Sequence, residues 1–144
     1  MIGLLDRSKH WNALKIVLRY IKDTLDYGLM YRRLQHEDKN EEGVTLPGYT
    51  DADFGKCLDS RKSVSGYCFT LHGCLVSWRS QLQRVVALST TESEFMAAIE
   101  CIKEAMWLQG LLKELGVDAR PAMVYSDSQS ALHLMKNPTF HDRS

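Results

Sequence analysis

A long helical pattern followed at once by a β-prone run is the feature that most constrains how this chain folds. From about Thr91 to Leu115, apolar side chains recur every three or four residues, as on the buried face of a helix. This stripe comprises Phe95, Ala98, Ile99, Ile102, Ala105, Met106 and Leu112. Because residues 122–125 then form a β-prone run, the order of elements predicts a strand-helix-strand crossover, with the helix packed on the sheet.

Three further β-prone runs precede the long helix, at residues 45–52, 64–71 and 74–78. His72 and Gly73 separate the last two runs by a tight turn, which is typical of a hairpin. The sequence therefore predicts an α/β fold with a mixed sheet, in which an antiparallel meander joins the crossover. We expect the apolar run 85–88 to be buried. A second helix is expected at residues 129–136, stopped by Asn137-Pro138.

Residues 1–43 are predicted to form a separate segment. Between about Asp6 and Leu25, apolar residues at helical spacing predict an amphipathic helix. Residues 28–31 predict a short strand, and a polar linker, residues 36–43, follows it. We therefore place a domain boundary there, and residues 44–144 form the α/β domain.

Composition excludes several classes of protein. Lys and Arg together number 18, as do Asp and Glu, so the bulk charge predicts no nucleic-acid-binding tail. The opening apolar run, residues 1–5, is too short for a signal peptide or a membrane span. The four cysteines lack the spacing of a zinc site, so we expect them to be reduced. These features predict an intracellular, soluble protein with no membrane partner.

Two carboxylates stand at the end of the first predicted strand. Side chains two apart on a strand share a face, so Asp51 and Asp53 would repel each other if the strand continues that far. A divalent cation bound by their oxygens would reverse this repulsion. The alternative is that an aspartate simply ends the strand in a turn.

The long helix and the last strand add further carboxylates. Capping-box spacing joins Ser89 to Glu92 and Thr91 to Glu94, and local sequence does not decide which glutamate caps the helix. Asp127 lies where the last strand passes into a helix, a common position for ligand groups, although an N-cap is the alternative. An aspartate from each strand end and one glutamate would together suit Mg²⁺ or Mn²⁺.

Short motifs follow one another along the chain: Gly48-Tyr49-Thr50-Asp51-Ala52-Asp53, Asp59-Ser60-Arg61-Lys62-Ser63, Val76-Ser77-Trp78, Ala87-Leu88-Ser89-Thr90-Thr91-Glu92-Ser93-Glu94-Phe95 and Ser126-Asp127-Ser128-Gln129-Ser130-Ala131. In this order they resemble the ribonuclease H region of copia-type LTR retrotransposon Pol polyproteins. His10-Trp11 and Leu18-Arg19-Tyr20-Ile21-Lys22 resemble the segment that joins reverse transcriptase to ribonuclease H in that family. The resemblance covers about residues 10–143 and implies an RNase H-like fold.

The resemblance also implies an activity, the metal-dependent cleavage of the RNA strand of an RNA–DNA hybrid at a two-metal Mg²⁺ or Mn²⁺ site. Asp51 and Asp127 match the family's aspartates on the first and fourth strands. Glu94, followed by Phe95-Met96-Ala97-Ala98, resembles the family's helix glutamate. The expected metal ligands and catalytic residues are therefore Asp51, Glu94 and Asp127. Glu92 is left for capping, and Asp53 for a supporting or structural role.

Partners follow from the same resemblance. We expect Arg61, Lys62, Arg79 and Gln81 to contact the hybrid, whose recognition would rest on backbone and 2′-hydroxyl contacts. The reverse transcriptase portion of the same polyprotein is the expected protein partner. The expected location is cytoplasmic or nuclear, in a virus-like particle for the parent family.

This sequence departs from the family at two places. The family continues into a further helix, strand and final helix that supply a fourth carboxylate, and this sequence ends at Ser144, so we expect a domain that is incomplete at its C-terminus. Lys56-Cys57 also stand where the family tends to have Gly-Asp. The alternative function is therefore a catalytically inactive retrotransposon remnant or a hybrid-binding module. Truncation predicts exposed apolar sheet surface and, with it, oligomers.

Overall fold

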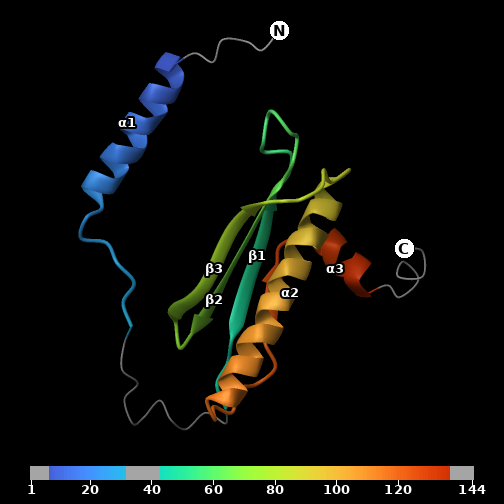
Figure 1. Ribbon diagram of the computed structural model, residues 1–144. Coiled ribbons are helices and arrows are strands. Elements are labelled where there is room, and N and C mark those ends of the chain that lie inside the picture. The colour runs from blue at the N-terminus through green and yellow to red at the C-terminus, as the bar shows by residue number, and fades with distance from the viewer. Residues whose placement is uncertain (1–6, 32–42, 137–144) are drawn as a thin grey trace. The chain divides into compact units, whose positions relative to one another are not determined.

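The computed structural model of the protein describes residues 7–31 and 43–136. The chain divides into two compact units, Met1–Met30 and Tyr31–Ser144, which are described separately. In the first unit, helix α1 (Arg7–Asp23; Figure 1) confirms the predicted amphipathic helix. Its apolar side chains are exposed. The strand predicted at residues 28–31 is wrong, because this segment is irregular backbone. A strand needs a neighbour for its hydrogen bonds, and the described residues provide none for this run.

A four-stranded mixed sheet is the centre of the second unit (Figure 1). Its strands are β1 (Pro47–Asp53), β2 (Val64–Leu71), β3 (Cys74–Leu82) and β4 (Met123–Ser126). They lie in the order β3-β2-β1-β4, with β1, β2 and β3 antiparallel in turn and β1 parallel to β4. The predicted α/β class, meander and crossover are thus confirmed. Strand β3 runs beyond its predicted end at Trp78, because it pairs along the whole of β2.

Helix α2 (Thr90–Glu114) connects β3 to β4 and packs against β1 and β2 (Figure 1). The buried cluster beneath it comprises Leu46, Phe69, Cys101, Ala105 and Leu108. The predicted stripe is wrong at Ile102 and Met106, which are 40% and 68% exposed. Small side chains such as Cys101 and Ala105 let the helix approach the sheet closely, and the Phe69 ring fills the space beneath it.

The end of α2 and the extent of the last helix are as predicted. Gly116, with φ of 71°, follows α2. Its N–H donates to the carbonyl of Lys113 at 3.0 Å, and that of Val117 donates to the carbonyl of Leu112 at 2.9 Å, the two bonds of a Schellman motif. Helix α3 (Gln129–Lys136) has the predicted bounds.

The apolar run 85–88 is not buried as a whole, contrary to the prediction. Only Ala87 is buried, whereas Val85, Val86 and Leu88 are exposed, the last at 89%. The run belongs to the irregular connection between β3 and α2, where successive side chains do not share one face. In this connection the apolar run therefore buries one side chain, that of Ala87, and leaves its neighbours in solvent.

The sheet face away from α2 exposes apolar side chains, as predicted. Tyr49 alternates along β1 with the buried Thr50, so it points to the opposite face. Its ring stacks on that of Tyr125 in β4, with centroids 5.4 Å apart. Trp78 and Met123 are exposed as well. Oligomer formation through this surface remains a prediction.

Candidate metal centre

Three carboxylates meet where β1 and β4 end. Asp51 comes from β1, Glu94 from the beginning of α2, and Asp127 directly follows β4. Because β1 and β4 are parallel neighbours, their carboxyl ends lie at the same edge of the sheet. One carboxylate oxygen from each residue lies within 4.8 Å of the others. The fold therefore brings together the three residues that were expected to be ligands.

A single backbone amide orients two of these carboxylates. The N–H of Ala52 donates to Asp51 Oδ1 at 2.9 Å and to Glu94 Oε1 at 3.3 Å. Ala52 is held in place by the sheet, where it pairs with Ser65 of β2. The position of a helix carboxylate is thereby tied to the strand that carries the first aspartate.

Glu92 caps α2 and does not belong to the carboxylate cluster. Its backbone N–H donates to Ser89 Oγ at 3.1 Å, and its Oε2 accepts the N–H of Leu88 at 2.6 Å. The first bond satisfies an N–H of the first helical turn, and the second ties the Glu92 side chain to the residue before the Ser89 cap. The predicted capping role of Glu92 is confirmed, while Glu94 reaches the cluster.

Asp127 is not the residue that caps α3. Ser128 Oγ accepts the N–H of Ala131 at 3.2 Å, which is the usual N-cap contact. The N–H of Ser128 in turn donates to Ser126 Oγ at 3.2 Å. The alternative in which Asp127 serves as an ordinary cap is therefore wrong, and its carboxylate lies in the cluster instead.

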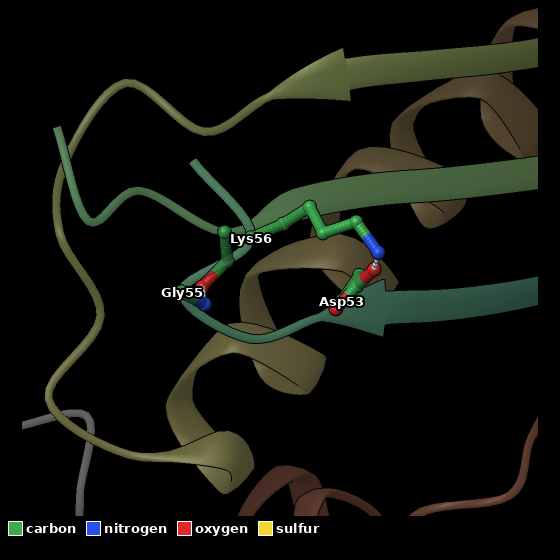
Figure 2. Close-up of polar contacts among 4 residues, drawn as sticks. Asp53, Gly55 and Lys56 are labelled. Atoms are coloured by element: carbon green, nitrogen blue, oxygen red, sulfur yellow. Dashed lines mark hydrogen bonds and ion pairs between the residues drawn. The ribbon is translucent and has the colours of Figure 1, made fainter. Parts of the chain in front are cut away.

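Asp53 is engaged away from the three carboxylates. Its Oδ2 lies 2.8 Å from Nζ of Lys56, and Figure 2 shows this ion pair beside Gly55. The carboxylate raises the pKa of Lys56, first by its hydrogen bond and then by its charge. Lys56 is one of the two residues that replace the Gly-Asp of the family motif, and here it pairs with the aspartate at the strand end. A structural role for Asp53 fits this contact.

The surroundings of Glu94 disfavour its charged form. Burial raises the pKa of its carboxyl most, and the charges of Asp51 and Asp127 raise it further, against the hydrogen bond from Ala52. Its Oε2 is buried and has no hydrogen-bond partner among the described residues. A cation between the three carboxylates would satisfy that oxygen and reverse the sign of the repulsion.

Replacing Glu94 by Gln should stabilise the metal-free protein at pH 7. A carboxyl group whose pKa is raised on folding contributes stability below its unfolded pKa, and this is lost as pH rises through the folded pKa. Glutamine removes the charge, so we expect a gain of roughly 0.5 kcal/mol, or roughly 2–4 °C in Tm. Thermal unfolding in EDTA should show this gain at pH 7 and little of it at pH 4. An unchanged or lower Tm at pH 7 would contradict the expectation.

The predicted nucleic-acid contacts fall into two groups. Arg61 and Lys62 belong to the loop between β1 and β2, which begins directly after Asp53. The loop is closed by hydrogen bonds from Arg61 N–H to the Cys57 carbonyl at 2.7 Å and from Cys57 N–H to the Lys62 carbonyl at 3.0 Å. Arg61 is exposed, with φ of 57°. This loop presents its positive charge at the end of the strand that carries Asp51.

Arg79 and Gln81 instead line an open pocket beside α2. The same pocket includes Arg84 and Lys103, which the sequence did not single out. Their proximity depends on how α2 packs against the sheet, and no spacing along the chain reports that packing. Local sequence indicates one contact in this pocket. Glu100 precedes Lys103 by three residues on the same helix, and the two form an ion pair at 2.7 Å.

Fold and site together define an α/β domain whose sheet edge gathers three carboxylates. Over 137 residues, the chain is 45% identical to the retrovirus-related Pol polyprotein from transposon TNT 1-94 of Nicotiana tabacum, covering 95% of this chain. It is 37% identical over 135 residues, or 93% of this chain, to the Pol polyprotein from transposon RE2 of Arabidopsis thaliana. Its homologues are thus copia-type retrovirus-related Pol polyproteins, and the predicted resemblance is confirmed at that level.

The chain matches a small part of these polyproteins, 10% of the first and 9% of the second. The chain is also 50% identical over 99 residues to secreted RxLR effector protein 161 of Plasmopara viticola. This match covers 69% of this chain and 65% of that protein. No protein-family model matches the chain, and no solved structure does. Among the described residues, no helix is long and apolar enough to cross a membrane.

Proposed function

We propose that the α/β unit is a ribonuclease H-type domain of a retroelement, which hydrolyses the RNA strand of RNA–DNA hybrids with the help of a divalent cation. The observation that carries this proposal is the convergence of Asp51, Glu94 and Asp127, with carboxylate oxygens within 4.8 Å of one another. The ordered motifs and the Pol polyprotein homologues support it. The reverse transcriptase portion of the same polyprotein is the proposed protein partner.

The three carboxylates fit a hard divalent cation such as Mg²⁺ or Mn²⁺. Each offers an anionic oxygen, which is the ligand type these ions prefer. The buried Oε2 of Glu94 has no hydrogen-bond donor among the described residues, so a cation could take that place. The negative charges of Asp51 and Asp127 help to raise the pKa of Glu94, and a bound cation would offset this repulsion. The donor set is therefore better suited to an occupied centre than to an empty one.

When bound, such ions supply Lewis-acid stabilisation of charge on the phosphodiester and favour ionisation of water. The residues of the chain hold and orient the centre. Ala52 fixes Asp51 and Glu94 by its N–H, and Glu92 fixes the helix start from which Glu94 projects. Asp51 and Asp127 are exposed, so a polymer can approach the centre from solvent.

The test is a cleavage assay with the whole 144-residue chain. An end-labelled RNA–DNA hybrid is incubated with Mg²⁺ or with EDTA, beside a DNA duplex and single-stranded RNA of the same sequence. We expect RNA fragments only from the hybrid and only with the metal. Binding of the hybrid without cleavage would favour the alternative, a hybrid-binding module or an inactive remnant. Equal cleavage in EDTA would contradict the metal-dependent proposal.

A further inference from the structure

An open pocket of about 440 Å³ lies between the sheet and α2, on the side of β2 and β3. Its polar and charged lining includes Tyr67, Arg79, Gln81, Arg84, Glu100 and Lys103. None of the three carboxylates of the metal centre is part of this lining. The volume suits a small ligand or a single unit of a polymer.

The pocket carries an excess of positive charge. Three cations, Arg79, Arg84 and Lys103, face one carboxylate, that of Glu100. The hydrogen bond from Lys103 lowers the pKa of Glu100 most, and the charges of all three cations lower it further. All three therefore act on the same small region. Among the residues that line the pocket, cations therefore outnumber carboxylates by two, in a chain whose formal net charge is zero.

The inner wall of the pocket is fixed before any ligand arrives. The side-chain amide of Gln83, a buried residue, donates to Ser65 Oγ at 2.8 Å and to the Ser93 carbonyl at 2.9 Å. Tyr67 donates its hydroxyl to Glu104 Oε2 at 3.2 Å. These bonds join β2, α2 and the connection after β3. A preformed wall lowers the entropic cost of ordering side chains on binding.

The pocket lies beside the metal centre across the strands, because residues of both occupy paired positions on β1, β2 and β3. Gln81 pairs with Ser65, and Ser65 pairs with Ala52, whose N–H orients two of the carboxylates. Neighbouring strands lie about 4.8 Å apart, so two strand spacings separate the β1 and β3 positions by roughly 10 Å. A nucleic-acid strand with one phosphate at the centre brings further phosphates within this distance, since its charges recur at intervals of about 3.4 Å along the helix axis.

We propose that this pocket seats a backbone phosphate of the bound nucleic acid, with Glu100 as a built-in competitor that holds Lys103 until the phosphate displaces it. The inference rests on the proposed function, which makes an RNA–DNA hybrid the substrate. Guanidinium groups such as those of Arg79 and Arg84 bind phosphate in a bidentate manner, and a lining in which cations outnumber carboxylates suits a phosphodiester. A free nucleotide offers the same chemistry, so the test separates the two sources.

Removal of the competitor gives the sharpest test, because a gain in affinity does not arise from misfolding. In Glu100→Gln, we expect the hybrid to bind about 3- to 10-fold more tightly at low salt. Fluorescence anisotropy of a labelled hybrid in EDTA measures binding without metal-dependent cleavage. The affinity of Glu114→Gln, which removes a carboxylate at the last residue of the same helix, should stay within about twofold of wild type. An unchanged affinity in Glu100→Gln would overturn the proposal.

Removal of the cations should have the opposite effect. Arg84→Ala and Lys103→Ala should each weaken hybrid binding by about 3- to 10-fold and reduce the steepness of its salt dependence by about one unit. Lys113→Ala is the matched control, since Lys113 lies in the last turn of α2 and does not line the pocket. Its affinity and salt dependence should match wild type. A double variant, Arg84→Ala with Lys103→Ala, that keeps the wild-type salt dependence would overturn the proposal.

A titration with GMP and with inorganic phosphate identifies the source of the phosphate. Millimolar competition that the pocket variants abolish, beside the expected changes in hybrid binding, supports a strand phosphate in the pocket. Tight binding of GMP with unchanged hybrid binding in the variants would assign the pocket to free nucleotides and overturn the proposal. Cleavage by the wild type with no effect of Glu100→Gln on binding would reject this inference alone. The expected binding changes without any cleavage would reject the nuclease proposal alone.

Discussion

Replacing Asp51 by Asn is expected to reduce magnesium-dependent cleavage of an RNA–DNA hybrid by about 100-fold or more. Asparagine keeps the size of the side chain and an oxygen that can accept the N–H of Ala52, which Asp51 Oδ1 accepts at 2.9 Å. The substitution therefore removes one negative charge from the centre with little change in shape. Asp127→Asn should have a comparable effect, since Asp127 belongs to the same cluster. Rates of product formation under single-turnover conditions measure both losses.

Asp53→Asn is the matched control for Asp51→Asn. Asp53 lies two residues along the same strand, and its carboxylate is paired with Lys56 rather than with the cluster (Figure 2). An exposed ion pair contributes little, so we expect activity within about twofold of wild type. Equal losses in the two variants would show that strand integrity, and not the centre, is being measured. Full activity in Asp51→Asn would remove the catalytic assignment.

Metal binding gives a readout that is independent of activity. A ligand that binds only the folded protein raises Tm, so Mg²⁺ should raise the Tm of the wild type in a concentration-dependent manner. Asp51→Asn and Asp127→Asn should lose this rise while remaining folded, and Asp53→Asn should keep it. A variant that fails to cleave but keeps the full rise in Tm would separate catalysis from metal binding.

Local patterns were enough to predict the elements, because hydrophobic period and turn chemistry are properties of short segments. Strand β2 and helix α3 have the predicted bounds, and the Gly116 stop lies where expected. The Ser89 cap is one of the two that local sequence left open. Where the prediction failed, the missing information was about neighbours. Residues 28–31 have the composition of a strand and form none.

The same division applies to the candidate site. Strand ends and a helix start predicted a cluster of carboxylates, but the choice of Asp51 and Glu94 over Asp53 and Glu92 came from the family resemblance. The parallel pairing of β1 and β4 then brings the three carboxylates together. The amide of Ala52, the ion pair of Asp53 with Lys56 and the charged pocket beside α2 depend on distances that only packing fixes. Met106 shows the same limit of sequence-based prediction in α2. Its hydrophobicity suggested a buried side chain, but the helix packs its small residues against the sheet and leaves Met106 exposed.

Replacing Gly48 by Ala should destabilise the protein by about 1–3 kcal/mol. A Cβ atom at this position would lie 2.3 Å from the ring of Phe69, a distance that real Cβ atoms do not show. The ring cannot move aside cheaply, because Phe69 has no exposed surface and belongs to the cluster beneath α2. Urea denaturation monitored by circular dichroism measures the loss as a shift in midpoint.

Gly110→Ala is the matched control and should have the opposite sign. Gly110 lies inside α2, and nothing lies within 4 Å of a Cβ added there. Alanine favours the helix by about 0.5–1 kcal/mol over glycine, so this variant should be more stable than wild type. Phe69→Leu should offset part of the loss in Gly48→Ala, because a smaller side chain opposite residue 48 relieves the clash. Strictly additive losses in the double variant would contradict a direct contact between the two positions.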